Sequence, residues 1–139
     1  MSKKRILIVD DDVTATRLLK LGLEKTGDYE VREENSSLQG LAVAQQFHPD
    51  LILLDIVMPH IDGGDLAARI EADRTLKGTP VVFLTSLISE QEELEGHVQR
   101  GGHRFLAKPV QAPKVIRCIE EELGSRANPL AVAAPVLGD

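Results

Sequence analysis

Residues 51–55 read Leu51-Ile52-Leu53-Leu54-Asp55, four consecutive apolar residues closed by a carboxylate. An apolar run of this length without polar alternation is typical of a strand buried on both faces of a parallel sheet. Similar short runs with abrupt ends occur at Ile6–Val9, Val81–Leu84 and Phe105–Ala107, and a more polar version occurs at Tyr29–Arg32. We therefore predict five strands.

Segments with helical spacing of apolar residues alternate with these runs. They comprise Val13–Thr26, Ser37–Phe47, Gly63–Asp73, a segment opening with a capping box at Ser89, and a last segment with Pro113 in its first turn. The alternation predicts an α/β fold, a five-stranded parallel doubly wound sheet with five helices on its two faces.

The spacing also predicts which side of each helix is apolar. We expect Leu18 and Leu21, with Val13, to form the stripe of the first helix, and Gly27 to follow it at C′. The expected stripes of the other helices are Leu38, Leu41, Ala42 and Gln45; Leu66, Ala67 and Ile70; Leu94 and Val98; and Val115, Ile116, Ile119 and Leu123.

Composition favours one cytoplasmic globular domain. The chain has 139 residues, of which 42% are hydrophobic and 27% charged, with a net charge of −6. This charge disfavours non-specific nucleic-acid binding, and no apolar stretch approaches the ~20 residues that span a bilayer. Cys118 is the only cysteine, so no internal disulfide can form. We expect a domain over residues 1–124, followed by a tail or the start of a linker at 125–139.

Side chains that can bind metal ions or phosphate, or take part in catalysis, follow four of the five predicted strands. The four groups are Asp10-Asp11-Asp12, Asp55, Thr85-Ser86 and Lys108-Pro109. In open parallel sheets the ligand site lies beyond the carboxyl ends of the strands, where these groups converge. Alone, Asp12 can simply cap a helix and Asp55 can be a turn residue. Together, carboxylates repel at a cost of about 4 kcal/mol per pair at ~4 Å and an effective dielectric of ~20, so a Mg²⁺ ion is expected among them.

Four stretches with these ends resemble the receiver domains of bacterial response regulators. They are Ile6–Asp11, Leu53–Gly63, Phe83–Ser86 and Phe105–Pro109, and the similarity runs from about Lys4 to Leu123. It implies a flavodoxin-like fold with strand order 2-1-3-4-5.

The resemblance implies a function for each matching residue. Asp55 would be the phosphoacceptor, with Asp11 binding Mg²⁺ directly, Asp10 binding it through water or weakly, and the backbone carbonyl of Val57 as a further ligand. The remaining residues lie on the last two strands: Lys108 would contact the phosphoryl oxygens, Thr85 would turn toward them, and Phe105 would be the rotating aromatic switch. The Lys108–Pro109 bond would be cis.

The implied function is a phosphorylatable signalling module that catalyses only its own phosphorylation and dephosphorylation. Its partners would be a sensor histidine kinase or histidine phosphotransfer protein and a downstream protein that reads the surface of the fourth helix, fifth strand and fifth helix. A phosphorylation-dependent homodimer is a further option, and no output domain is expected in the sixteen residues after Leu123.

Two other functions stay open from the residues. A pseudo-receiver would bind partners without phosphate, although the full set of acids, threonine and lysine disfavours it. A Mg²⁺-dependent phosphohydrolase similar to the haloacid dehalogenases needs a second Asp two residues after the nucleophile, where this chain has Val57.

Overall fold

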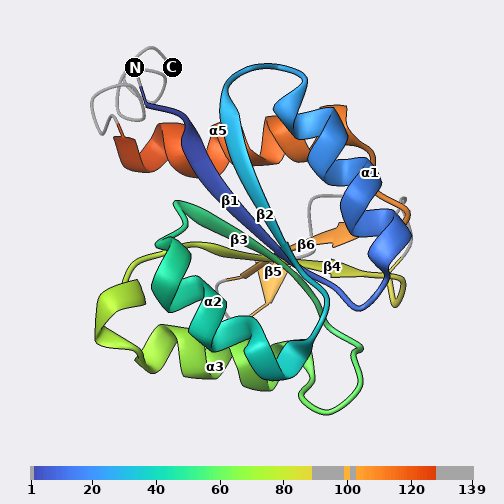
Figure 1. Cartoon of the computed structure of the whole chain (residues 1–139), viewed down its shortest axis with the longest axis vertical. Helices are drawn as coiled ribbons and strands as arrows, with labels where there is room; N and C mark the ends of the chain where they lie inside the picture. Colours follow the sequence, from blue (N-terminus) through green and yellow to red (C-terminus); the bar gives the residue numbers. More distant parts are fainter. Residues whose placement is uncertain (1, 89–98, 101–102, 128–139) are drawn as a thin grey trace.

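The computed structural model describes residues 2–88, 99–100 and 103–127, and it is a parallel sheet between two layers of helices (Figure 1). Its five long strands are β1 (Lys4–Val9), β2 (Tyr29–Glu34), β3 (Leu51–Asp55), β4 (Val81–Thr85) and β6 (His103–Ala107). Their order, β2-β1-β3-β4-β6, is the predicted 2-1-3-4-5, and all four pairings are parallel. The sequence did not predict β5 (Gln99–Arg100), which pairs antiparallel with β6 at the sheet edge.

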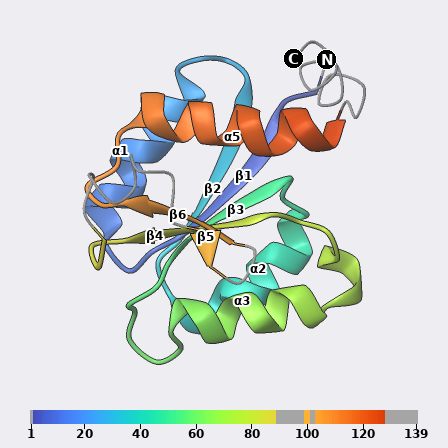
Figure 2. The same ribbon diagram turned by 180° about the vertical axis from the view of Figure 1, so that it is seen from behind.

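Four α-helices lie within the described residues. They are α1 (Val13–Glu24), α2 (Gly40–Phe47), α3 (Gly63–Ala72) and α5 (Ala112–Ala127). The predicted helix that opens at Ser89 lies outside the described residues. Helices α1 and α5 cover one face of the sheet and α2 and α3 the other, as Figures 1 and 2 show from opposite sides.

The core consists of two clusters, one on each face of the sheet. All five residues of β3 are buried, which confirms the prediction of a central strand. Alternate strand residues enter opposite clusters: Leu53 packs with α1 and α5, and Leu54 packs with α2 and α3. The stripes of α3 and α5 are confirmed, because Leu66, Ala67, Ile70, Val115 and Ile119 are buried and Ile116 and Leu123 are partly buried.

The predicted stripe of α1 is wrong. Leu18 and Leu21 are 65% and 58% exposed, and the buried side chains are Thr16, Leu19 and Leu23. Leucines occur all around this helix, so spacing alone does not define its buried side. A hydrogen bond from the Thr16 hydroxyl to the Glu33 carboxylate on β2 helps to select the buried side. The predicted C′ position of Gly27 is wrong by one residue, because the C-cap of α1 is Lys25. Gly27 instead takes a positive φ of 84° in the turn to β2.

The predicted stripe of α2 is wrong for Leu38, Ala42 and Gln45, which are exposed, whereas Leu41 is partly buried against the core. Residues Ser37–Gln39 form a separate 3-10 helix, and α2 begins only at Gly40. The buried side chains are Val43, Ala44 and Phe47, whereas Leu38 is 56% exposed. Gly40 packs so closely on α3 that a Cβ there would lie 2.6 Å from a methyl group of Leu66. This contact between α2 and α3, invisible in the spacing, orients the helix.

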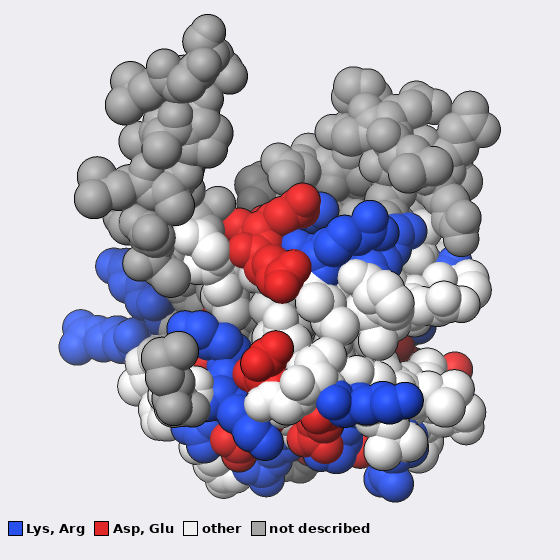
Figure 3. Space-filling view, turned by 90° about the horizontal axis from the view of Figure 1, so that it is seen from above, with Lys and Arg blue, Asp and Glu red and all other residues white. Residues whose placement is uncertain are grey.

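Surface charge is mixed on the face seen in Figure 3, where Lys and Arg side chains lie among Asp and Glu side chains. Ion pairs of α1 are of this kind, with Arg17 3.0 Å from Glu33 and Lys20 3.0 Å from Glu24. Within the described part of the chain, each helix is too short or too polar to cross a membrane.

Candidate functional site

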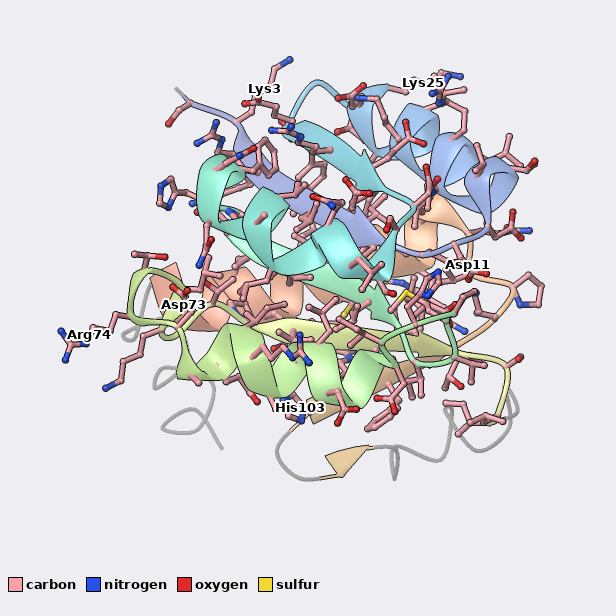
Figure 4. The ribbon with its side chains drawn as sticks, turned by 60° about the horizontal axis from the view of Figure 1, so that its bottom comes forward. Lys3, Asp11, Lys25, Asp73, Arg74 and His103 are labelled. Carbon is pink, nitrogen blue, oxygen red and sulfur yellow. The ribbon has the colours of Figure 1, made fainter. Side chains whose placement is uncertain are left out.

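The register of the sheet brings the predicted site residues to one edge. Val9 pairs with Leu54, so the next residues along the two strands, Asp10 and Asp55, are neighbours. On the other side of β3, Asp55 pairs with Leu84 of β4. Figure 4 shows Asp11 at this end of the sheet, with Asp73 and Arg74 at the opposite end.

Three carboxylates form a cluster at this edge. Asp10, Asp11 and Asp55 each offer an oxygen atom within 4.8 Å of the others. Asp10 and Asp55 are buried, at 2% and 5% exposure, and Asp11 is exposed. This donor set suits a hard divalent cation such as Mg²⁺, which binds few carboxylates and retains several waters. Asp12 is not in the cluster, and its side chain accepts a hydrogen bond from the Ala15 N–H at 3.0 Å, which confirms it as the cap of α1.

Asp10 is held at four points. Its N–H donates to the Glu34 carbonyl at 3.1 Å, and its carbonyl accepts from the Asn35 amide at 2.8 Å. Its carboxylate accepts from the Asp12 N–H at 2.9 Å and lies 2.8 Å from the Lys108 ammonium. These contacts compensate for much of the solvation that Asp10 loses on burial.

Asp55 is less fully compensated than Asp10, because Lys108 lies 3.5 Å from its carboxylate and 2.8 Å from that of Asp10. Burial and, next, the negative charge of Asp10 raise the pKa of Asp55 to about 6, although Lys108 acts in the opposite direction. A hydrogen bond from the Val57 N–H also lowers it. Because 6 is below physiological pH, Asp55 is mainly ionised at pH 7 and is available as a nucleophile or metal ligand.

Lys108 is the positive charge of the pocket. Its Nζ atom lies 2.8 Å from Oδ2 of Asp10 and 3.5 Å from Oδ2 of Asp55. Burial lowers the pKa of Lys108, but its hydrogen bond to Asp10 and the charges of both carboxylates outweigh burial and raise it overall. The Lys108–Pro109 bond is cis, as the resemblance implied.

Thr85 ends β4, where its carbonyl accepts a hydrogen bond from the Lys108 N–H at 2.9 Å, and Phe105 lies two residues before the end of β6. Thr85 is buried, pairs with Ala107 in the sheet, and accepts a hydrogen bond from the Leu87 N–H at 3.0 Å. Phe105 is partly buried and stacks on Phe83 of β4 at 5.1 Å between ring centroids. The aromatic ring therefore packs on the α2–α3 side of the sheet.

A cavity of about 650 Å³ adjoins the acidic pocket. Asp10 and Lys108 line it together with Ala15 and Leu18 of α1 and Val110 after β6. The lining combines these charged groups with apolar side chains and leaves room beside the carboxylates for a group larger than water.

The structure adds two residues that sequence reasoning missed, Asn35 and Ser37. Both follow β2, the one strand end to which no chemistry was assigned. Asn35 donates to the carbonyl of Asp10, and the Ser37 hydroxyl donates to the Pro59 carbonyl at 2.6 Å. The polar run Asn35-Ser36-Ser37 directly after a strand was the signal that could have identified them.

Known proteins with similar sequences cover most of this chain. The polar-differentiation response regulator DivK of Brucella ovis is 32% identical over 121 residues, which are 87% of this chain and 97% of DivK. The DNA-binding dual master transcriptional regulator RpaA of Synechocystis sp. is 35% identical over 112 residues, which are 81% of this chain. The chain spans about half of the length of RpaA, 46%.

Similar solved structures share the fold over nearly their whole length. A CheY-like response regulator receiver domain protein from Methanospirillum hungatei has a TM-score of 0.75 at 30% identity, covering 91% of this chain and 98% of its own. A family model described as the response regulator receiver domain matches residues 6–120. The chain therefore belongs to the family of response regulator receiver domains.

Proposed function

We propose that Asp55 accepts a phosphoryl group from a phosphohistidine on a partner protein, and that Mg²⁺ bound at the acidic pocket assists the transfer. The observation that carries this proposal is the convergence of Asp10, Asp11 and Asp55 within 4.8 Å, with Lys108 facing them. A fold gains no stability from gathering three acids in this way, so the arrangement favours a bound cation and an anionic ligand.

Asp11 and Asp55 would bind Mg²⁺ directly, with the Val57 carbonyl as a third ligand and Asp10 acting through water. When bound, the cation would offset negative charge on the phosphoryl oxygens. Lys108 would do the same, because its ammonium lies 3.5 Å from the Asp55 carboxylate.

In the transfer, an Asp55 oxygen forms a bond to phosphorus while the bond from phosphorus to the donor's imidazole nitrogen breaks. The electron pair of the broken bond stays on that nitrogen. Asp55 needs no general base, because a carboxyl with a pKa of about 6 is mainly ionised at pH 7. The remaining requirement is that the nucleophile and the groups that stabilise charge are held in position, which the ends of the rigid strands provide.

Exposed apolar side chains around the pocket support a protein as the donor. Val13, Val57 and Leu87 are 57%, 64% and 71% exposed, and each lies in a loop or helix start that leaves the same sheet edge. Exposed apolar groups next to a charged site are typical of protein contact surfaces.

The phosphorylated state would be read through Thr85 and Phe105. The Thr85 hydroxyl would turn from the Leu87 N–H toward a phosphoryl oxygen, and the Phe105 ring would move after it, changing the surface beside β6 and α5. This is a shift between two populations that a downstream protein or a second copy of the chain could distinguish.

Incubation of the protein with acetyl phosphate and Mg²⁺, followed by intact-mass measurement, tests the proposal. We expect one phosphoryl group per chain, none in Asp55→Asn, and none when EDTA replaces Mg²⁺. No modification would indicate a pseudo-receiver, and release of many equivalents of phosphate per chain would indicate a phosphohydrolase.

A further inference from the structure

We infer that Asn35 and Ser37, at the carboxyl end of β2, are positioning residues for the metal pocket, each holding one of its two backbone segments. The inference rests on the proposed function, since it concerns Mg²⁺ binding at Asp10, Asp11 and Asp55. Neither side chain belongs to the carboxylate cluster, so both would act through the backbone.

Asn35 holds the first segment, at the end of β1. Its amide nitrogen donates to the Asp10 carbonyl at 2.8 Å and to the Thr16 hydroxyl at 3.0 Å. Thr16 is 1% exposed on α1 and also lies 2.9 Å from the Glu33 carboxylate. One side chain of the β2 end thus ties the turn that carries Asp10 and Asp11 to both β2 and α1.

Ser37 holds the second segment, the loop between Asp55 and α3. Its hydroxyl, on a residue only 3% exposed, donates to the Pro59 carbonyl at 2.6 Å and accepts from the Ile61 N–H at 3.1 Å. The same N–H lies 3.0 Å from the Pro59 carbonyl, which closes a three-residue turn around His60.

His60 has a positive φ of 74° in this turn. A γ-turn with φ near +75° is the rare, strained form, and it persists only where surrounding contacts hold it. The Ser37 hydroxyl bonds both ends of the turn and is therefore one of the contacts that hold it. The loop also contains Val57, whose N–H donates to Asp55 and whose carbonyl is the proposed metal ligand.

Mg²⁺ requires nearly ideal octahedral geometry, so small displacements of its ligands reduce its affinity. Without Asn35, the Asp10–Asp11 turn loses a support that does not depend on charge. Without Ser37, the strained turn can relax and the Val57 carbonyl can move. Partners that orient metal ligands typically contribute 10–100-fold to affinity, and we expect an effect near the lower end for each residue.

Titration of the whole chain with MgCl₂ in a calorimeter at pH 8 tests the inference. The variants are Asn35→Ala and Ser37→Ala, and the matched control is Ser36→Ala, whose side chain caps no helix. We expect both variants to raise the Mg²⁺ dissociation constant about tenfold. The control should stay within about twofold. Urea unfolding of the same samples supplies a measure of stability that is independent of metal.

The outcomes separate this inference from the proposed function. If the wild-type protein binds no Mg²⁺, the proposed function fails and the inference fails with it. If the wild-type protein binds Mg²⁺ and both variants bind it within twofold, only the inference is overturned, whatever their stability. If one variant does not fold, the other decides, and a loss of folding in both overturns the inference by assigning these side chains to the fold.

Discussion

The ammonium group of Lys108 is bonded to Asp10, at 2.8 Å between Nζ and Oδ2, and it lies 0.7 Å farther from Asp55, at 3.5 Å. The cation therefore compensates Asp10 more fully than Asp55. This asymmetry leaves Asp55 with a raised pKa of about 6. It also leaves Asp55 as the carboxylate with most to gain from a second cation.

Replacement of Lys108 by Ala should raise the pKa of Asp55 above 6, because Lys108 is the main group that lowers it. A titration of the Asp55 carboxyl carbon by NMR in EDTA would measure the change. Lys25→Ala, which removes an exposed lysine at the end of α1, should leave the Asp55 pKa unchanged. An unchanged Asp55 pKa in Lys108→Ala would show that the contacts with Lys108 do not determine the pKa of Asp55.

Replacement of Asp55 by Asn should stabilise the metal-free protein at neutral pH. The folded pKa of about 6 exceeds the unfolded value of about 3.9, so the folded state binds more protons between these values. Stability is therefore lost as pH rises from 4 to 6, and Asn removes this penalty. We expect a gain of about 1–3 kcal/mol at pH 7.5 and almost none at pH 4.

Urea unfolding in EDTA at the two pH values measures this gain. Asp12→Asn is the matched control, because Asn caps a helix as well as Asp does and Asp12 lies outside the carboxylate cluster. A large loss of stability in Asp55→Asn at pH 7.5 would contradict the claim that the crowded negative charge of Asp55 destabilises the folded protein.

Mg²⁺ affinity should fall as pH falls through about 6, because binding requires ionised Asp55. With one proton displaced, the dissociation constant should rise about tenfold per pH unit below 6 and level off above 7. Calorimetric titrations from pH 5 to 8 would show this, and an affinity that is independent of pH between 5 and 7 would count against Asp55 as a ligand.

Gly63 and Gly64 should differ sharply when each is changed to Ala. A Cβ at Gly63 would overlap the Asp55 carbonyl oxygen and lie 2.7 Å from the Ile56 Cα, whereas a Cβ at Gly64 would meet only an Asp62 carboxylate oxygen at 3.4 Å. We expect Gly63→Ala to lose about 2 kcal/mol or more and Gly64→Ala to gain up to about 1 kcal/mol. Thermal unfolding would measure both, and equal effects would refute the close approach of α3 to β3.

Leu18 and Leu19, adjacent on α1, should also respond differently to Ala. Leu19 is 6% exposed and belongs to the core, so Leu19→Ala should cost about 2–5 kcal/mol. Leu18 is 65% exposed, so Leu18→Ala should change stability by less than about 0.5 kcal/mol. Urea unfolding of both variants distinguishes the observed burial of Leu19 from the burial of Leu18 that residue spacing alone predicts.

The local sequence pattern was sufficient to predict the fold class. Runs such as Leu51–Leu54 are apolar on both faces, and only burial between two helical layers removes both faces from water. The acids and the lysine that follow these runs also indicated the pocket, because parallel strands end at one edge. The residues of the cluster could therefore be predicted before their distances were known.

Tertiary structure decided the rotation of α1 and α2 and the contribution of the β2 end. Leu18 and Leu19 are chemically identical, and contacts such as the hydrogen bond of Thr16 to Glu33 help to select the buried side of α1. For α2, the packing of Gly40 on Leu66 has the same effect. Asn35 and Ser37 are ordinary turn residues until the register of β1, β2 and β3 brings the Asp10 carbonyl and the Pro59 turn within their reach. The sequence determines which side chains follow each strand. Contacts between residues distant in sequence, however, exist only once the sheet has assembled.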